Sequence, residues 1–324
     1  MIRIAIVGMG LIGTSLGMAL RAGNSATDAL GQIQVIGYDA DKANAKEARG
    51  RLAIDVVADS LKQALDGTHL VILAVPAQAT PALFREMGPL LSTGAVVTDV
   101  CSTKAQIAAW ADEILPKTNP FIGGHPMAGR DASGPKAATS DLFKGAVYCL
   151  CPGLTTPPEA IALCEAMAER VGAKTYFIEP VEHDAYVAGI SHLPFVLAAG
   201  LVNMTANASS WREMSALAAT GFRDTTRLAS GDVIMHRDIV MTNRIALERW
   251  LDEAITELQT FKDMVTSGDE AAIADYFTHA KTARATWLEQ KPSMRPGEAE
   301  YEDTGMDMVQ RPSLFGRMGG GKKS

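Results

Sequence analysis

The sequence predicts an α/β domain with a parallel sheet, followed by an all-helical domain. Over roughly the first 180 residues, short β-branched apolar runs alternate with segments rich in Ala, Leu, Lys and Glu. Strands that are apolar throughout and alternate with helices are typical of a parallel sheet covered on both faces. After Pro180 the strand signals almost disappear and long helical segments follow. We therefore expect domains over residues 1–180 and 181–290, and a disordered tail over residues 291–324, where Pro, Gly and charged residues prevail.

The expected elements follow in chain order. Short β-branched runs favour strands, and longer segments with apolar residues every three or four positions favour helices. The expected strands cover residues 2–7, 33–38, 70–75, 95–100, 121–124, 146–151 and 174–178. Helices of the first domain are expected from about residue 11 to 20, and over 41–49 and 80–91. The second domain is expected in four helical segments, over 181–204, 214–230, 237–266 and 269–288.

The composition is that of a globular protein and excludes several classes. The 324 residues are 47% hydrophobic and 21% charged, which argues against a disordered chain or a multi-span membrane protein. With 30 Lys and Arg against 37 Asp and Glu, the net charge of −7 would repel a nucleic-acid backbone. The four cysteines lack the spacing of a zinc or redox site, so we expect buried free thiols, no bound metal and a cytoplasmic location. They are Cys101, Cys149, Cys151 and Cys164.

A glycine motif follows the first expected strand directly. Gly8, Gly10 and Gly13 form the pattern G-x-G-x-x-G between an apolar strand and a helical segment. In this context Gly8 makes the tight turn, Gly10 lets the backbone approach a pyrophosphate, and Gly13 lets the helix pack close to the sheet. The pyrophosphate then lies on free N–H groups at the start of the helix, around Leu11 and Ile12. The motif therefore predicts a Rossmann-like dinucleotide-binding domain.

Asp39 ends the second expected strand, 26 residues after Gly13. A carboxylate there accepts hydrogen bonds from the adenine-side ribose hydroxyls and repels a 2′-phosphate, so we expect NAD in preference to NADP. The alternative is that Asp39 is only a turn residue before Asp41. Val75 and Pro76 end another strand at the edge where ligands of such sheets bind. These two residues contact the cofactor, or Pro76 simply ends the strand; the sequence supports both interpretations equally.

Two polar side chains are candidates for the chemistry. Thr103 and Gln106 have the spacing of a capping box, so Thr103 is expected to cap the next helix and leave Ser102 facing the ligand crevice. His125 follows two glycines and precedes Pro126, at the end of an expected strand. A histidine there can accept a hydroxyl proton while hydride leaves the same carbon. A purely structural Ser102 and a hydrogen-bonded structural His125 remain the alternatives.

The helical domain offers two further candidate groups. Ser191 and His192 precede Pro194 in an apolar helical run, where the proline predicts a kink. The two polar side chains at this kink either line a binding site or form hydrogen bonds within the domain. Arg223 and Arg227 lie four residues apart, on one face of a helix. Two guanidinium groups suit an anionic substrate such as a carboxylate, although pairing with a neighbouring acid is the usual alternative.

Taken together, these motifs resemble the prephenate and arogenate dehydrogenases of tyrosine biosynthesis. The resemblance extends in the family's order from about Ile2 to Arg284, and the series is far more specific than any single motif. It implies a nucleotide-binding domain followed by a helical domain that forms a homodimer, with the active site between the domains. The matching segments are VGMGLIG (7–13), DVCSTK (99–104), GGHPMAG (123–129), HD (183–184), SHLP (191–194) and FRDTTR (222–227).

The resemblance also implies a reaction, the oxidative decarboxylation of a small cyclohexadiene substrate. NAD takes hydride from the ring carbon that bears the hydroxyl, the ring carboxylate leaves as carbon dioxide, and the ring becomes aromatic. In that scheme His125 accepts the hydroxyl proton and Ser102 supports its hydrogen bond. Arg227 binds a substrate carboxylate, and Arg223 adds positive potential at the entrance.

Two positions depart from the family's pattern. Some prephenate-preferring relatives carry a second histidine after the SHLP motif, where this chain has Phe195. This departure favours arogenate, or both substrates. The loop after GGHPMAG begins with the bulky cation Arg130, and Asp131 beside it either gates an active-site arginine or is a solvated loop acid.

Two rival functions remain. One is a different dehydrogenase with the same two-domain plan, acting on 3-hydroxyacids or imines, although it does not explain the segment around His125 or the paired arginines. The other is a catalytically silent dinucleotide sensor, which would bind NADH without turning over any cyclohexadiene.

Overall fold

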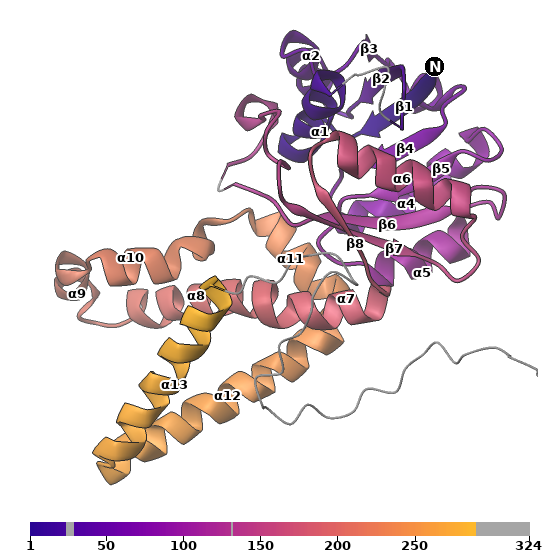
Figure 1. The fold of residues 1–324 in the computed structure, drawn as a ribbon. Helices are drawn as coiled ribbons and strands as arrows, with labels where there is room; N and C mark the ends of the chain where they lie inside the picture. The colour runs from indigo at the N-terminus through magenta and orange to yellow at the C-terminus, as the bar shows by residue number, and fades with distance from the viewer. Residues whose placement is uncertain (24–28, 131, 290–324) are drawn as a thin grey trace, which may run out of the picture.

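The computed structural model describes residues 1–23, 29–130 and 132–289. The chain forms a sheet domain and a helical domain whose long arms extend away from the sheet (Figure 1). The last strand ends at Phe177 and the first helix of the second part begins at Pro180, where the texture of the sequence also changes. The tail expected over residues 291–324 and the loop acid Asp131 lie outside the described residues.

Within the described residues, one eight-stranded sheet has the order β3-β2-β1-β4-β5-β6-β7-β8. Neighbours are parallel from β3 to β6, whereas β7 is antiparallel to β6 and β8 is parallel to β7. The chain leaves β1 toward β2 on one side and returns to β4 on the other, which places the topological switch point between β1 and β4. The strands are β1 (Ile2–Val7), β2 (Ile33–Tyr38), β3 (Val56–Val57), β4 (Leu70–Leu73), β5 (Val96–Asp99), β6 (Phe121–Pro126), β7 (Val147–Pro152) and β8 (Lys174–Phe177).

Alternate residues of the central strands pack on opposite faces of this sheet. Ile4 and Ile6 of β1 lie in a core shared with α1, α2 and α6, whereas Ala5 and Val7 lie in a second core shared with α3, α4 and α5. The apolar strands are therefore covered on both faces, as the sequence predicts. These helices are α1 (Leu11–Ala22), α2 (Lys42–Gly50), α3 (Leu61–Leu65), α4 (Thr80–Met87), α5 (Ala105–Ile114) and α6 (Pro158–Arg170).

The second domain is helical throughout its described residues. Figure 1 shows α8 and α10 running side by side, and α12 and α13 forming a long hairpin. The helices are α7 (Pro180–Val187), α8 (Leu193–Ala206), α9 (Trp211–Leu217), α10 (Thr220–Thr226), α11 (Val233–Thr242), α12 (Arg244–Ser267) and α13 (Glu270–Glu289). A π-helical turn, Ala188–His192, joins α7 to α8, and a 3-10 turn, Arg227–Ser230, follows α10.

The irregularity expected before Pro194 is present as this π-helical turn. The N–H of Leu193 bonds to the carbonyl of Ala188, five residues back, so the helix is widened by one residue ahead of the proline. The combined run Pro180–Ala206 is long and apolar enough to cross a membrane by length and composition alone. Here it packs in a helical domain, where α8 contacts α10 and the 3-10 turn after it.

One local expectation was wrong. The capping box at Thr103 does not form, because α5 begins at Ala105 and Thr103 hydrogen-bonds to the hydroxyl of Thr242 instead, at 2.7 Å. The sheet is not parallel throughout, because a loop rather than a crossover helix joins β6 to β7. The elements β3, α3 and α6 were not predicted. For β3 and α3 the reason is that two and five residues are too few to show a period.

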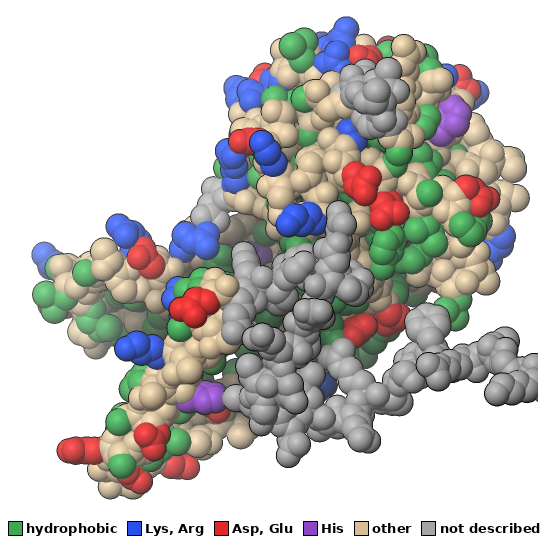
Figure 2. Space-filling view, in the orientation of Figure 1, with side chains coloured by type: hydrophobic (Ala, Val, Ile, Leu, Met, Phe, Trp, Pro, Cys, Tyr) green, Lys and Arg blue, Asp and Glu red, His purple; other side chains and the backbone are tan. Residues whose placement is uncertain are grey.

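Charged side chains of both signs are scattered over the face of the molecule seen in Figure 2. Lys and Arg lie among Asp and Glu there, with hydrophobic side chains exposed between them on the helical arms. Several large apolar residues of α8 and α12 are more than 60% exposed. They are Met204, Ile245, Ile255 and Leu258.

Candidate active site

The glycine turn between β1 and α1 lies at the switch point of the sheet. Gly8 has a φ of +97°, and a Cβ on it would lie 2.3 Å from the carbonyl oxygen of Ala74. A Cβ on Gly13 would lie 1.9 Å from the carbonyl oxygen of Gly8. The fold itself therefore requires two of the three glycines.

Gly10 has no such structural reason to be glycine. Nothing lies within 4 Å of the position of its Cβ, yet it is the N-cap residue of α1 and offers no side-chain cap. Leu11 and Ile12 are half-buried in the first turn of α1, which carries no acidic residue. A side chain at residue 10 would fill the space before the free N–H groups of the helix, so the turn fits a dinucleotide pyrophosphate.

Asp39 is held beside this turn. Its Oδ2 accepts a hydrogen bond from the N–H of Met9 at 2.7 Å, and its Oδ1 accepts one from the N–H of Asp41 at 2.8 Å. The carboxylate therefore shapes the turn before α2 and also lies against the glycine turn. Val75 is half-buried and Pro76 exposed just past β4, where Pro76 begins a 3-10 turn.

His125 meets a histidine–aspartate pair from the helical domain. Its Nδ1 lies 2.9 Å from Nε2 of His183, and Nδ1 of His183 lies 2.8 Å from Oδ1 of Asp184. Exposed fractions are 7%, 1% and 4% for the three residues. Burial lowers the pKa of His125 well below its usual value, and the nearby His183, Lys104 and His192 lower it further. His125 is therefore a neutral imidazole near pH 7 and can accept a proton.

A buried ion pair holds the backbone next to His125. Nζ of Lys104 pairs with Asp99 and donates a hydrogen bond to the carbonyl of Gly124, while Oδ1 of Asp99 accepts one from the N–H of Gly124 at 3.0 Å. Both charged side chains are fully buried. A Cβ on Gly124 would lie 2.4 Å from the carbonyl oxygen of Asp99, so glycine is required there. The ion pair and the close contact fix the strand position of the histidine.

Asp184 also ties the helical domain to the start of α5. Its Oδ1 accepts a hydrogen bond from the N–H of Lys104 at 2.7 Å, and its Oδ2 accepts one from the N–H of Ala105 at 2.9 Å. Asp184 thus takes the capping place expected of Thr103. The sequence signal was the HD segment itself, a polar pair in an apolar helical run, to which no role was assigned.

Ser102 and His192 lie against one another at the domain boundary. Ser102 is half-buried, and its hydroxyl has no hydrogen-bond partner among the described residues. His192 is fully buried, with Nδ1 3.1 Å from Nδ2 of Asn243 and with the Ser102 backbone beside its ring. Burial lowers the pKa of His192 to about 4, against the opposing charge of Asp184. Ser191, in the same π-helical turn, is half-buried.

The two arginines lie on α10 and on the 3-10 turn that follows it. Arg223 is exposed on α10 and pairs with Asp224 at 2.9 Å, and Arg227 is exposed at the start of the following 3-10 turn. Both elements pack on α8. Phe195 of α8 is buried and stacks on His236 of α11, with ring centroids 4.2 Å apart.

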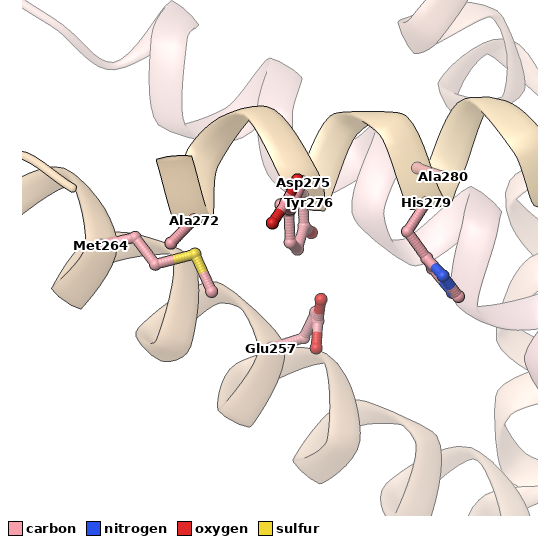
Figure 3. A pocket seen from close by; sticks show the side chains of 7 residues that line it. All are labelled: Glu257, Met264, Ala272, Asp275, Tyr276, His279 and Ala280. Atoms are coloured by element: carbon pink, nitrogen blue, oxygen red, sulfur yellow. The ribbon is translucent and has the colours of Figure 1, made fainter. Parts of the chain in front are cut away.

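A separate hollow lies between α12 and α13 (Figure 3). Its volume is about 480 Å³, and Glu257 and Tyr276 lie on its facing walls. A hydrogen bond to Glu257 raises the pKa of Tyr276. None of the predicted site residues lines this hollow. Among the described residues, no group of three or more His, Cys, Asp or Glu could hold a metal ion.

A glycine turn at the switch point of the sheet, together with a neutral histidine held between two domains, defines a dinucleotide-dependent dehydrogenase. Family models support a more specific assignment. The prephenate dehydrogenase nucleotide-binding domain matches residues 25–177, and the prephenate dehydrogenase dimerization domain matches residues 179–279. The chain belongs to the prephenate dehydrogenase family. The glycine turn precedes the matched segment, so it is independent evidence for the cofactor site.

Individual relatives agree with this assignment. The chain is 34% identical to a prephenate dehydrogenase of Bacillus subtilis (strain 168), over 87% of this chain and 75% of the relative. It is 30% identical to a cyclohexadienyl dehydrogenase of Zymomonas mobilis, over 90% of this chain and 98% of the relative. The crystal structure of a prephenate dehydrogenase from A. aeolicus, in complex with hydroxyphenyl propionate and NAD+, matches with a TM-score of 0.81 and 28% identity. That match covers 88% of this chain and 98% of the other.

An arogenate dehydrogenase is also similar. The crystal structure of the Synechocystis enzyme matches with a TM-score of 0.75 and 30% identity, over 88% of this chain and 100% of the other. Similar proteins therefore include enzymes named for prephenate, for arogenate and for cyclohexadienyl substrates in general.

Proposed function

We propose that this chain catalyses the NAD-dependent oxidative decarboxylation of prephenate, arogenate or both, in tyrosine biosynthesis. The observation that carries the proposal is the buried, neutral imidazole of His125 at the carboxyl end of β6, bonded to the helical domain. The relatives named above act on these substrates. NAD is the expected cofactor because Asp39 lies against the glycine turn, where its charge disfavours a 2′-phosphate, and the A. aeolicus relative was crystallised with NAD+.

The chemistry assigns one proton transfer to the protein. When bound, NAD accepts a hydride from the ring carbon that carries the substrate hydroxyl. His125 takes the proton of that hydroxyl, so the C–O bond becomes a carbonyl. Cleavage of the bond to the ring carboxylate then releases carbon dioxide and leaves the electron pair in the ring, which becomes an aromatic phenolate. The protonated His125 returns its proton to the phenolate oxygen and is regenerated.

The remaining site residues bind and orient the substrate in this proposal. The hydroxyl of Ser102 supports the hydrogen bond between His125 and the substrate. Ser191 and His192 line the substrate site from the helical domain, and Val75 and Pro76 border the cofactor. Arg227 binds a substrate carboxylate, and Arg223 adds positive potential at the entrance.

Substrate choice depends in this proposal on the surroundings of Phe195. An apolar ring stands where some prephenate-preferring relatives have a histidine, which favours arogenate or a shared preference. His236 stacks on this ring, so an imidazole is still close to the position.

Initial rates test the proposed function directly. Purified protein is assayed with prephenate and with arogenate, each with NAD and with NADP, and NADH formation and carbon dioxide release are measured. We expect turnover of at least one cyclohexadiene, with NAD preferred. NADH binding without turnover of either cyclohexadiene would instead indicate the dinucleotide sensor.

We also infer that the helical domain forms a homodimer. The matched domain is the family's dimerization domain, and exposed apolar residues on α8 and α12 would be buried by a second copy. We further infer a cytoplasmic location, which the four buried free thiols support and which cell fractionation would check.

A further inference from the structure

We propose that Asp184, acting through His183, fixes the tautomer of His125 so that the lone pair that accepts the substrate proton lies on Nε2. This inference rests on the proposed function for its catalytic consequence. It concerns positioning, because Asp184 and His183 act on the substrate only through His125.

Asp184 sets the direction of the hydrogen bonds. Two of its partners are the N–H groups of Lys104 and Ala105, at 2.7 and 2.9 Å, and a backbone N–H can only donate. Both carboxylate oxygens are therefore acceptors. The Nδ1 of His183, 2.8 Å from Oδ1, must then be the protonated ring nitrogen.

The protonation of His183 in turn determines which nitrogen of His125 is protonated. A neutral imidazole has one donor and one acceptor, so Nε2 of His183 is an acceptor when Nδ1 is the donor. The Nδ1 of His125 lies 2.9 Å from that Nε2 and must supply the hydrogen. Nε2 of His125 is then left unprotonated, with its lone pair available to a substrate hydroxyl. If the donors and acceptors were reversed, the lone pair on Nδ1 of His183 would face a carboxylate oxygen of Asp184. Two acceptors would then oppose each other in a buried site, which is unfavourable.

The arrangement also suits the protonated form of His125. After Nε2 accepts a proton, Nδ1–H still donates to His183, and the negative charge of Asp184 lies at the far side of that ring. The chain of donors and acceptors does not need to reorganise during the reaction. Asp184 and His183 therefore prepare the base before substrate arrives.

Nitrogen NMR of the full chain with bound NAD tests the tautomer without an activity assay. The protein is labelled with ¹⁵N-histidine, and His125 and His183 are assigned from the His125→Asn and His183→Gln variants. We expect protonated Nδ1 and unprotonated Nε2 in both rings. A His125 ring protonated on Nε2 in the wild-type protein would overturn the inference.

Variants at His183 test the consequence for catalysis. A glutamine can donate from its amide nitrogen to Asp184 and accept at its amide oxygen from His125, whereas a leucine of similar size can do neither. We expect His183→Leu to lower kcat by about 100-fold or more, on the scale of a lost general base, with KM within about threefold. His183→Gln should retain at least about tenfold more activity than His183→Leu. Equal kcat values in the two variants would overturn the inference.

Asp184→Leu removes the acceptor that faces Nδ1 of His183, so the order of donors is no longer fixed. In a Ser-His-Asp triad, replacing the orienting aspartate with asparagine lowers kcat by about 10⁴-fold through the wrong tautomer. Asp184 also holds α5, so Thr103→Val is the control: it removes a buried hydrogen bond across the same boundary and does not touch the two histidines. We expect kcat of Thr103→Val within about threefold of wild type, and in Asp184→Leu a His125 ring that is protonated on Nε2. Histidine signals in Asp184→Leu that are the same as in wild type would overturn the inference.

The two proposals can fail separately. If neither cyclohexadiene is turned over while His125 carries its proton on Nδ1, the proposed reaction is wrong and the tautomer assignment stands. If turnover is normal and His125 carries its proton on Nε2, the reaction stands and the role of Asp184 and His183 is wrong.

Discussion

Nδ1 of His125 lies 2.9 Å from Nε2 of His183, although the two residues are 58 positions apart in the chain. The strand β6 supplies one ring and the helix α7 supplies the other. The proposed base therefore has its hydrogen-bonding partner only while the helical domain is packed against the sheet domain. Asp184 reinforces that packing by capping α5 of the sheet domain.

Replacing His125 with asparagine should stop proton removal and leave the cofactor site intact. We expect kcat to fall by about two to four orders of magnitude, the scale of a lost general base, while the dissociation constant for NAD stays near normal. Steady-state rates and NADH fluorescence titration measure the two quantities. An unchanged rate would remove His125 from the mechanism.

The pH profile should report the burial of His125. The base works only when unprotonated, and burial together with His183, Lys104 and His192 lowers the pKa of His125 well below its usual 6.5. We expect kcat/KM to stay flat from neutral pH down through 6.5 and to fall only at more acidic pH. A falling limb centred at or above pH 6.5 would show that the imidazole is solvated in the free enzyme.

Asp39 should determine the preference between NAD and NADP. The change Asp39→Ser removes a charge beside the glycine turn, so we expect kcat/KM for NADP to rise by about tenfold or more, as like-charge repulsion disappears. Asp41→Ser is the matched control, because serine can still cap α2 and the lost charge is two residues away. If the preference for NAD over NADP changes equally in both variants, another residue determines that preference.

Arg227 should affect substrate binding more than chemistry. Loss of a charge-assisted hydrogen bond to a carboxylate predicts that Arg227→Ala raises KM for the cyclohexadiene by about 10- to 100-fold. The effect of Arg223→Ala should be smaller, since this guanidinium already pairs with Asp224. If KM is the same as in wild type, the carboxylate is bound by another group.

The helical domain should carry the dimer contact. Ile255 and Leu258 lie three residues apart on α12 and are 64% and 62% exposed, so aspartates at both positions should weaken a dimer that buries this face. Light scattering across a concentration series measures the change. Leu154→Asp is the control, because Leu154 is fully exposed in the sheet domain, after β7. A dimer as stable as wild type would exclude this face of α12 from the interface.

Several parts of the fold could be predicted because their signals are local. The strand at Ile2–Val7 has the predicted bounds, since the β-branched apolar run stops at the glycine motif. The turn after it follows from glycines whose backbone conformation and close contacts no other residue allows. The reversal of β7 had no such signal, because an apolar run does not record its direction.

Parts of the candidate site could likewise be predicted from the sequence, and other parts could not. His125 could be singled out because two glycines and a proline surround it at a strand end, and that spacing is visible in the chain itself. Its partners could not, because Asp184 reaches Lys104 across 80 positions and displaces a capping box that local spacing favoured at Thr103. Residue spacing limits what neighbours in the chain can do, whereas contacts between distant segments depend on how two packed domains meet. For this reason His125 could be proposed as the base from the amino-acid order alone, whereas its hydrogen-bonding partners emerged only from the folded chain.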